Sequence, residues 1–192
     1  GGGAGRQGGT RGGRNRVLRV LACAGRELRA LCSVAYHVWP RDGGAKYGDL
    51  LAPRTIPPMA GMRLDGTPFD IVELRGRWIV LYAAPGDCRG NCSGALYAAR
   101  QARTIQNAER ERVVRVWLVT DTSAPADALL AAHPDLTVAR VDAQSAGALP
   151  EGTDRIYLVD PLGNFVLAWP SKPDIKAMAK DLGRVLRASS IG

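Results

Sequence analysis

The sequence predicts an α/β domain in which helices flank a central mixed β-sheet. Two observations support this fold class. Apolar runs typical of buried strands alternate with helical patterns over residues 64–142. A strand pair at 155–169 is then followed directly by an amphipathic helical pattern at 172–189. Alternation of strands and helices favours a sheet with helices on both faces, and the late hairpin mixes antiparallel strands into it.

The first elements of this domain lie in the segment LDGTPFDIVELRGRWIVLYAA, residues 64–84. Asp65-Gly66 indicates a turn, and the residues around Phe69 and Ile71 indicate a short strand. After a second, glycine-containing turn, the continuous apolar run Trp78–Ala83 predicts a strand that is buried on both faces.

Four alternating elements follow: a helix over 92–112, a strand over 113–121, a helix over 123–134 and a strand over 136–142. The apolar side of the first helix consists of Leu96, Ala99, the stem of Arg103 and Ile105. In the second helix, Ser123 is the expected cap, Pro125 the start and Pro134 the stop.

The chain closes with a hairpin and a helix. RIYLVDPLGNFVLAW, residues 155–169, reads as two strands joined by turn chemistry at 160–164. The final helix spaces its apolar residues for burial at Ile175, Met178, Leu182, Val185 and Leu186. Strand, strand, helix, strand, helix, strand, hairpin and helix is the layout of a thioredoxin-like fold.

The N-terminal quarter of the chain has a different character. Residues 1–16 are rich in Gly and Arg without apolar periodicity, so we expect them to be disordered. Residues 17–39 have the length of a membrane span but contain four charges, which are costly at the bilayer centre. We expect either a short amphipathic helix or a degraded membrane anchor there. Residues 40–58 read as a linker and domain entry, with the domain beginning near Tyr47, and the main thioredoxin-like domain spans 59–192.

The net charge of +8 is unevenly distributed, because seven arginines fall in the first 29 residues. After residue 46 the two signs are nearly balanced, which argues against a nucleic-acid-binding surface. The local cluster of Arg100, Arg103, Arg110 and Arg112 is interleaved with Glu109 and Glu111, so we interpret it as a solvated helix face.

Two cysteines, Cys88 and Cys92, follow the strand predicted at Trp78–Ala83. If the helix begins near Cys88, its free amides and dipole stabilise a thiolate there. Arg89 acts in the same direction, whereas the charge of Asp87 opposes it. Cys92 would lie one turn further on the same face, so the pair could close a disulfide or hold one soft metal ion.

Two buried structural thiols are the alternative interpretation of this pair, since free cysteine is often buried. The flanking Gly86, Gly90 and Asn91 indicate exposed backbone and favour a functional pair instead. The chain's other cysteines, Cys23 and Cys32, lie in the N-terminal segment and receive no role.

The segments LDGTPFDIVELRGRWIVLY, the Cys-x3-Cys pair, VWLVTD and IYLVDPLGNFVLAWP resemble the Sco/SenC family of cytochrome c oxidase assembly proteins, in its short proteobacterial branch. The resemblance covers residues 47–192. It implies a thioredoxin fold facing the periplasm, anchored in the inner membrane by one N-terminal helix. There the domain delivers copper to the oxidase or keeps its copper-site thiols reduced. The implied partner is the copper-bearing oxidase subunit or another copper chaperone.

The chain departs from this family at one position. Copper-binding members carry a histidine ligand shortly before the Tyr-Leu strand, where this chain has Gly152 and Thr153. Its two histidines are elsewhere: His37 in the N-terminal segment, and His133 at a helix end, where we expect a solvent-facing or capping role. Two thiolates still suit Cu(I), so Cys88 and Cys92 are the predicted copper ligands.

The sequence therefore predicts an oxidase copper-site assembly factor that acts through Cys88 and Cys92, by thiol–disulfide exchange, by Cu(I) delivery, or by both. In exchange, the Cys88 thiolate attacks a target disulfide and Cys92 resolves the mixed disulfide. Two alternatives stay open: a non-catalytic assembly scaffold with a structural disulfide, and a thiol peroxidase-like protein.

Overall fold

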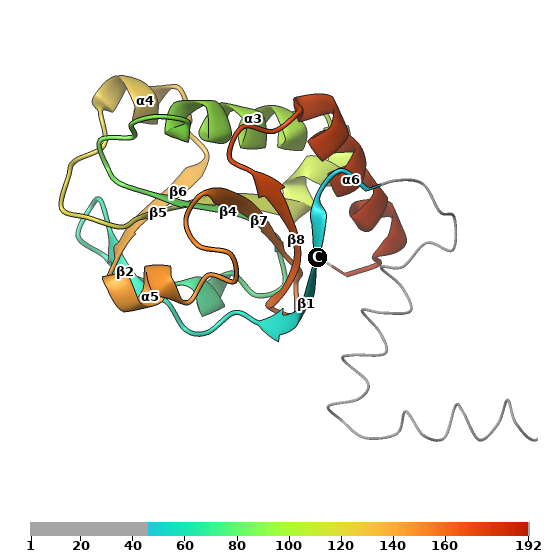
Figure 1. Cartoon of the computed structure of the whole chain (residues 1–192), viewed down its shortest axis with the longest axis horizontal. Helices are drawn as coiled ribbons and strands as arrows, with labels where there is room; N and C mark the ends of the chain where they lie inside the picture. The colour runs from blue at the N-terminus through green and yellow to red at the C-terminus, as the bar shows by residue number, and fades with distance from the viewer. Residues whose placement is uncertain (1–45, 192) are drawn as a thin grey trace, which may run out of the picture. The chain divides into compact units, whose positions relative to one another are not determined.

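The computed structural model describes residues 46–191, which form an eight-stranded mixed sheet flanked by helices (Figure 1). The strand order is β1-β8-β7-β4-β5-β6-β2-β3. The predicted thioredoxin-like α/β fold is confirmed. The strands are β1 (Asp49–Thr55), β2 (Ala60–Arg63), β3 (Pro68–Asp70), β4 (Trp78–Ala84), β5 (Val113–Val119), β6 (Leu136–Val141), β7 (Arg155–Val159) and β8 (Asn164–Pro170).

Helices cover both faces of this sheet. Figure 1 shows α3, α4 and α6 on one side and α5 on the other. The α-helices are α3 (Cys92–Thr104), α4 (Asp127–Ala131), α5 (Ala143–Gly147) and α6 (Ile175–Ala188), and the 3-10 helices are η1 (Ile71–Leu74) and η2 (Asn107–Arg112).

The centre of the sheet is parallel and its flanks are antiparallel. β4, β5 and β6 run in the same direction, with Trp78 opposite Val113 and Arg115 opposite Leu136. Every residue of β4 is buried, as expected for a strand covered on both faces. The carboxyl ends of the three strands therefore meet at one edge of the sheet, and their amino ends meet at the opposite edge.

The predicted hairpin is confirmed by the antiparallel pairing of β7 and β8. Its register places Arg155 opposite Pro170, so the residues just outside the hairpin, Asp154 and Ser171, become neighbours. The closing helix α6 is capped by Asp174, which accepts a hydrogen bond from the amide of Ala177. Of its predicted apolar residues, Met178, Leu182, Val185 and Leu186 are buried, and Ile175 is half-buried.

Several predicted boundaries are wrong. Residues 49–55, in the predicted domain entry for which no strand was expected, form the edge strand β1, which pairs with β8. Ile71 belongs to η1 and not to a strand. The long helix predicted at 92–112 ends at Thr104, and Asn107, with a φ of 54°, begins the 3-10 turn η2.

The helix predicted at 123–134 is only the short α4, and Ser123 does not cap it. The hydroxyl of Ser123 instead donates a hydrogen bond to Asp121. The segments predicted at 1–16 and 17–39, with Cys23, Cys32 and His37, lie outside the described residues. Among residues 46–191, no helix is both long and apolar enough to cross a bilayer.

Candidate redox site at the end of strand β4

The structure joins the two predicted site residues, Cys88 and Cys92, in a disulfide with their Cα atoms 5.1 Å apart. The bond lies between the carboxyl end of β4 and the start of α3. The two cysteines differ in accessibility. Cys88 is half-buried, whereas Cys92 is 1% exposed. An incoming thiol or disulfide therefore reaches the sulfur of Cys88 and not that of Cys92.

The start of α3 differs from the prediction. The helix begins at Cys92, not near Cys88, and Cys88 lies in the preceding turn with a left-handed φ of 49°. Asn91 at the N-cap position makes no side-chain cap hydrogen bond, so α3 begins without a side-chain cap beside the disulfide. Asp87 does not cap the helix either, because it pairs with Arg89 at 2.5 Å. The local charge of Arg89 is thus balanced by Asp87.

The loop in front of Cys88 is attached to the end of strand β5. The amide of Gly86 donates to Asp121 Oδ1 over 2.8 Å. Hydrogen bonds from Gly86 and from Ser123 hold the pKa of Asp121 below its usual range. Only glycine fits at position 86, because a Cβ there would overlap the carbonyl oxygen of Ser123. Asp121 thus accepts from the loop before Cys88 and from the turn after β5, and it joins the two.

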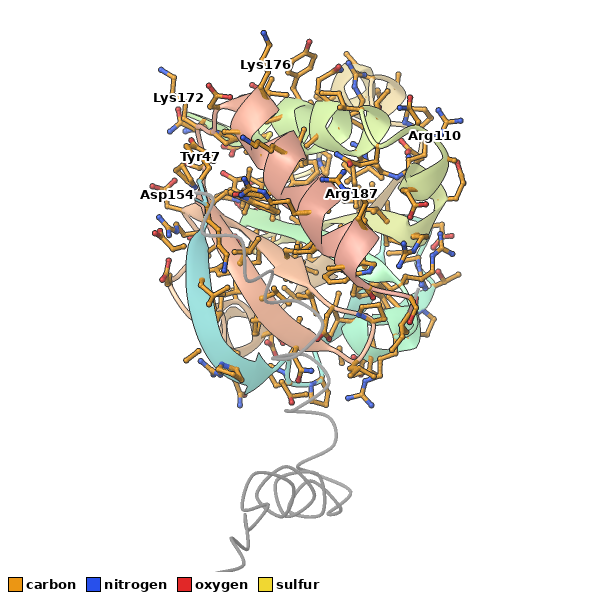
Figure 2. All side chains as sticks on the ribbon, turned by 90° about the vertical axis from the view of Figure 1, so that its right-hand side faces the viewer. Tyr47, Arg110, Asp154, Lys172, Lys176 and Arg187 are labelled. Carbon is orange, nitrogen blue, oxygen red and sulfur yellow. A yellow bond between two sulfur atoms is a disulfide. The ribbon has the colours of Figure 1, made fainter. Side chains whose placement is uncertain are left out.

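On its other side, the disulfide is flanked by a polar chain from the hairpin. Asn91, next to Cys92, donates to Ser171 Oγ at 3.5 Å, and the buried Ser171 hydroxyl donates to Asp154 over 2.5 Å. Burial, followed by the negative charge of Asp154, raises the pKa of the Tyr82 phenol on β4. Figure 2 shows Asp154 and Lys172 on the same side of the domain, with Tyr47 between them.

The sequence reasoning did not find Ser171 and Asp154. Their positions follow from the hairpin register, which brings residues 154 and 171 side by side beyond the last pair, Arg155 and Pro170. The predicted hairpin contained that signal. Their contact with Asn91 depends on the placement of α3 on the sheet, for which the sequence gives no local signal.

His133 does not lie at this site, and its predicted solvent-facing or capping role is wrong. The side chain is 5% exposed, and its Nδ1 lies 3.2 Å from Nη1 of the buried Arg115. It precedes β6, at the amino ends of the parallel strands, whereas the disulfide follows their carboxyl ends.

Within residues 46–191, no three His, Cys, Asp or Glu side chains gather as a metal cluster. The reduced pair would offer a metal two thiolates.

The predicted solvated arginine face on α3 and η2 is only partly correct. Arg110 is exposed, but Arg103 and Arg112 are largely covered. Arg103 donates to the carbonyl oxygen of Val113 and pairs with Asp135 at 2.5 Å. Arg112 donates to the carbonyl oxygen of Leu186 and so links η2 to the end of α6.

Comparison with known proteins agrees with this geometry. Residues 78–189 match the family described as the transmembrane-like, thioredoxin-like, C-terminal domain. The match covers more than half of the chain and includes both cysteines. The chain belongs to this family. No curated protein sequence matches it.

Solved structures of Sco proteins share the fold. Copper-bound ScoI of Arabidopsis thaliana has 19% sequence identity and a TM-score of 0.59, covering 71% of this chain and 100% of the other. Apo Sco1 of Thermus thermophilus has 18% identity and a TM-score of 0.60, covering 77% and 98%. BsSco, a Sco-family oxidase assembly protein with an identified disulfide switch, has 16% identity and a TM-score of 0.51, covering 70% and 98%. The predicted resemblance to the Sco/SenC family is thus confirmed at the level of the fold.

Proposed function

We propose that this domain is a cytochrome c oxidase assembly factor that reduces a partner disulfide with its Cys88–Cys92 pair, and that the reduced pair also carries Cu(I). One observation carries the proposal. The two cysteines form a disulfide in which Cys88 is accessible and Cys92 is buried. This asymmetry suits a pair in which one sulfur meets the partner and the other completes the reaction within the protein.

The exchange starts from the reduced protein. The Cys88 thiolate attacks one sulfur of the partner disulfide, forms a mixed disulfide and releases the second partner sulfur as a thiolate. The Cys92 thiolate then attacks the Cys88 sulfur and releases the first partner sulfur. The partner gains two electrons, and the Cys88–Cys92 disulfide forms. A separate dithiol reductant must restore the reduced pair.

The role of the helix start follows from where α3 begins. Both sulfurs lie at its N-terminal end, and the N-cap residue Asn91 makes no side-chain cap hydrogen bond. The positive end of the helix dipole lowers the cost of a thiolate on either cysteine. Asp154, connected through Ser171 and Asn91, contributes the opposing charge.

Copper would be cargo for the reduced pair. Two thiolates suit the soft Cu(I) ion, and copper-bound Sco proteins share this fold. The disulfide and the family resemblance favour the periplasm, where disulfides persist. An inner-membrane anchor in residues 17–39 belongs to the same proposal, and the partner would be the copper-bearing oxidase subunit or another copper chaperone.

A trapping experiment tests the exchange. In the full chain with Cys23→Ser and Cys32→Ser, the further substitution Cys92→Ser removes the resolving thiol and should accumulate a mixed disulfide with oxidised glutathione, seen as one added glutathione by mass spectrometry. Cys88→Ser is the matched control and should accumulate far less, because Cys92 is buried. Equal labelling of the two variants, or none in either, would leave a structural disulfide in a non-catalytic scaffold as the better explanation.

A further inference from the structure

Two of the helices on one side of the sheet, α3 and α6, carry a strongly uneven charge. Together they contain six cationic residues, Arg100, Arg103, Lys176, Lys180, Arg184 and Arg187, and one acidic residue, Asp181. Asp181 is 3% exposed and accepts hydrogen bonds from the amides of Tyr47 and Gly48, so it contributes little surface charge. The rest of residues 46–191 contains twelve cationic and fifteen acidic residues. The net positive charge of the domain is therefore concentrated on α3 and α6.

The exposed part of this face lies on α6. Lys176, Lys180 and Arg187 are exposed there, and Lys172 extends the same row before the helix. Figure 2 shows Lys172 and Lys176 projecting outward at one end of α6, with Arg187 further along the helix. None of these four side chains takes part in an ion pair of 4.0 Å or less in the described part of the chain. Their charge is directed to solvent. We call these four residues the α6 basic row.

The α6 basic row begins beside the redox site. Lys172 follows Ser171, whose hydroxyl accepts the hydrogen bond from Asn91, the neighbour of Cys92. From that end, α6 extends about 20 Å at 1.5 Å per residue. A partner whose disulfide meets Cys88 would therefore have an adjoining part of its surface over the row.

We propose that the α6 basic row is a docking surface for the acidic flank of the protein whose disulfide Cys88 reduces. This inference rests on the proposed exchange function and names the charge of its substrate. Complementary charge raises the association rate of two proteins by about 10- to 1000-fold at low ionic strength. The row thus selects among disulfides that are chemically alike.

The structure favours a protein partner over an anionic membrane. Amphipathic helices that bind membranes insert an apolar face, but the apolar face of α6 is packed into the core through Met178, Leu182 and Leu186. Acidic side chains, Asp87, Asp154 and Asp174, also lie around the disulfide end of the row. A mixed rim beside a basic row suits a shaped protein surface better than a uniform sheet of anionic headgroups.

Three synthetic peptides test this inference. Each contains the same internal disulfide, flanked on one side by glutamates, serines or lysines. The reduced full chain, with Cys23→Ser and Cys32→Ser, should reduce the glutamate peptide about tenfold faster than the lysine peptide at low ionic strength. The difference should shrink in about 1 M salt, where the Debye length is about 3 Å.

Charge reversal identifies the surface responsible. Lys176→Glu with Lys180→Glu should remove the preference for the glutamate peptide and leave the rate with the serine peptide nearly unchanged. Arg54→Glu with Arg75→Glu is the matched control. Both arginines are exposed, one on β1 and one before β4, and the net charge changes by the same amount. This control should retain the preference.

The outcomes separate the two proposals. If no peptide is reduced above the level of Cys88→Ser, the exchange function itself fails. If all three peptides are reduced at equal rates, or both charge-reversal pairs act alike, the exchange function stands and the docking surface is refuted. Binding to phosphatidylglycerol vesicles that requires Lys176 and Lys180, without discrimination among the peptides, would assign the row to a membrane and overturn the protein partner.

Discussion

The two ends of the parallel strands carry different groups: a disulfide at the carboxyl ends and a buried ionic cluster at the amino ends. At the carboxyl ends, the Cys88–Cys92 disulfide lies in a loop with an accessible sulfur and no histidine. At the amino ends, the buried Arg115 lies between His133 and Asp135, with no cysteine. Both groups contain residues that commonly serve as metal ligands or in catalysis. Only one of them is open to a partner.

The difference shows that accessibility and partners, not residue type, distinguish a reactive site from a structural one. His133 already interacts with Arg115, and burial together with the Arg115 charge lowers the pKa of its imidazole. Asp135 joins Arg115 to Arg103 on α3 and so ties that helix to the sheet. The only histidine in residues 46–191 is therefore part of the scaffold. In the cysteine pair, by contrast, Cys88 is only half-buried, so a partner can reach it.

Arg115→Ala should give the largest effect at the structural end. The substitution removes a side chain that is 1% exposed, leaves a cavity and releases both His133 and Asp135. We expect the free energy of unfolding to fall by about 2–4 kcal/mol, measured by urea denaturation. The exposed control Arg54→Ala should change it by less than about 0.5 kcal/mol.

The same variant tests the separation of the two ends. Because the cluster lies at the opposite edge of the sheet, the exchange rate of folded Arg115→Ala with oxidised glutathione should equal that of the unchanged chain. A large loss of exchange in protein that is still folded would show that the two ends are coupled.

Introducing a histidine beside the disulfide, at the carboxyl ends of the parallel strands, should change copper binding. Thr153 precedes Asp154 in the loop beside the disulfide, near where the Sco/SenC resemblance implies a histidine ligand. Thr153→His should raise the affinity of the reduced domain for Cu(II) by about tenfold or more, or about 1.4 kcal/mol, in a competition titration.

His133→Ala is the matched control for this titration. Its affinity for Cu(I) should be unchanged, and Cys88→Ser should abolish Cu(I) binding. Weakened copper binding in His133→Ala would mean that the scaffold cluster takes part in copper binding after all.

The sequence predicts those elements whose own residues form an apolar pattern typical of a buried strand or helix. The apolar run of β4, the hairpin and the apolar spacing of α6 each identify an element locally. The edge strand β1 and the short strand β2, next to the opposite edge, contain no buried residue, so no apolar alternation marks them. They are strands because β8 and β6, distant in sequence, offer them backbone hydrogen bonds.

For the candidate site too, some features could be predicted from local sequence and others could not. The cysteine spacing alone predicted that the two sulfurs could bond, and they do. The start of α3 at Cys92 was not predictable, because Cys88 adopts a left-handed turn that a helical pattern does not exclude. The burial of His133 depends on Arg115, a strand residue eighteen positions earlier. Pairing across such a distance leaves no local pattern.

The smallest expected effect is on the pH dependence of stability, which tests whether the amino-end cluster is closed to solvent. The folded pKa of His133 lies below the usual 6.5, so near and below that pH the unfolded chain binds the proton more readily than the folded one. The contribution of His133 to stability is therefore complete above about pH 6.5 and decreases as the pH falls through the folded pKa. Urea denaturation should show that the free energy of unfolding falls more between about pH 7.5 and about pH 5.5 for the unchanged chain than for His133→Gln, which cannot titrate. The exchange rate with oxidised glutathione should have the same pH profile in both proteins, because His133 and Cys88 lie at opposite edges of the sheet. Equal losses of stability would mean that the imidazole titrates as freely as in the unfolded chain, and that the amino-end cluster is less closed than its burial indicates.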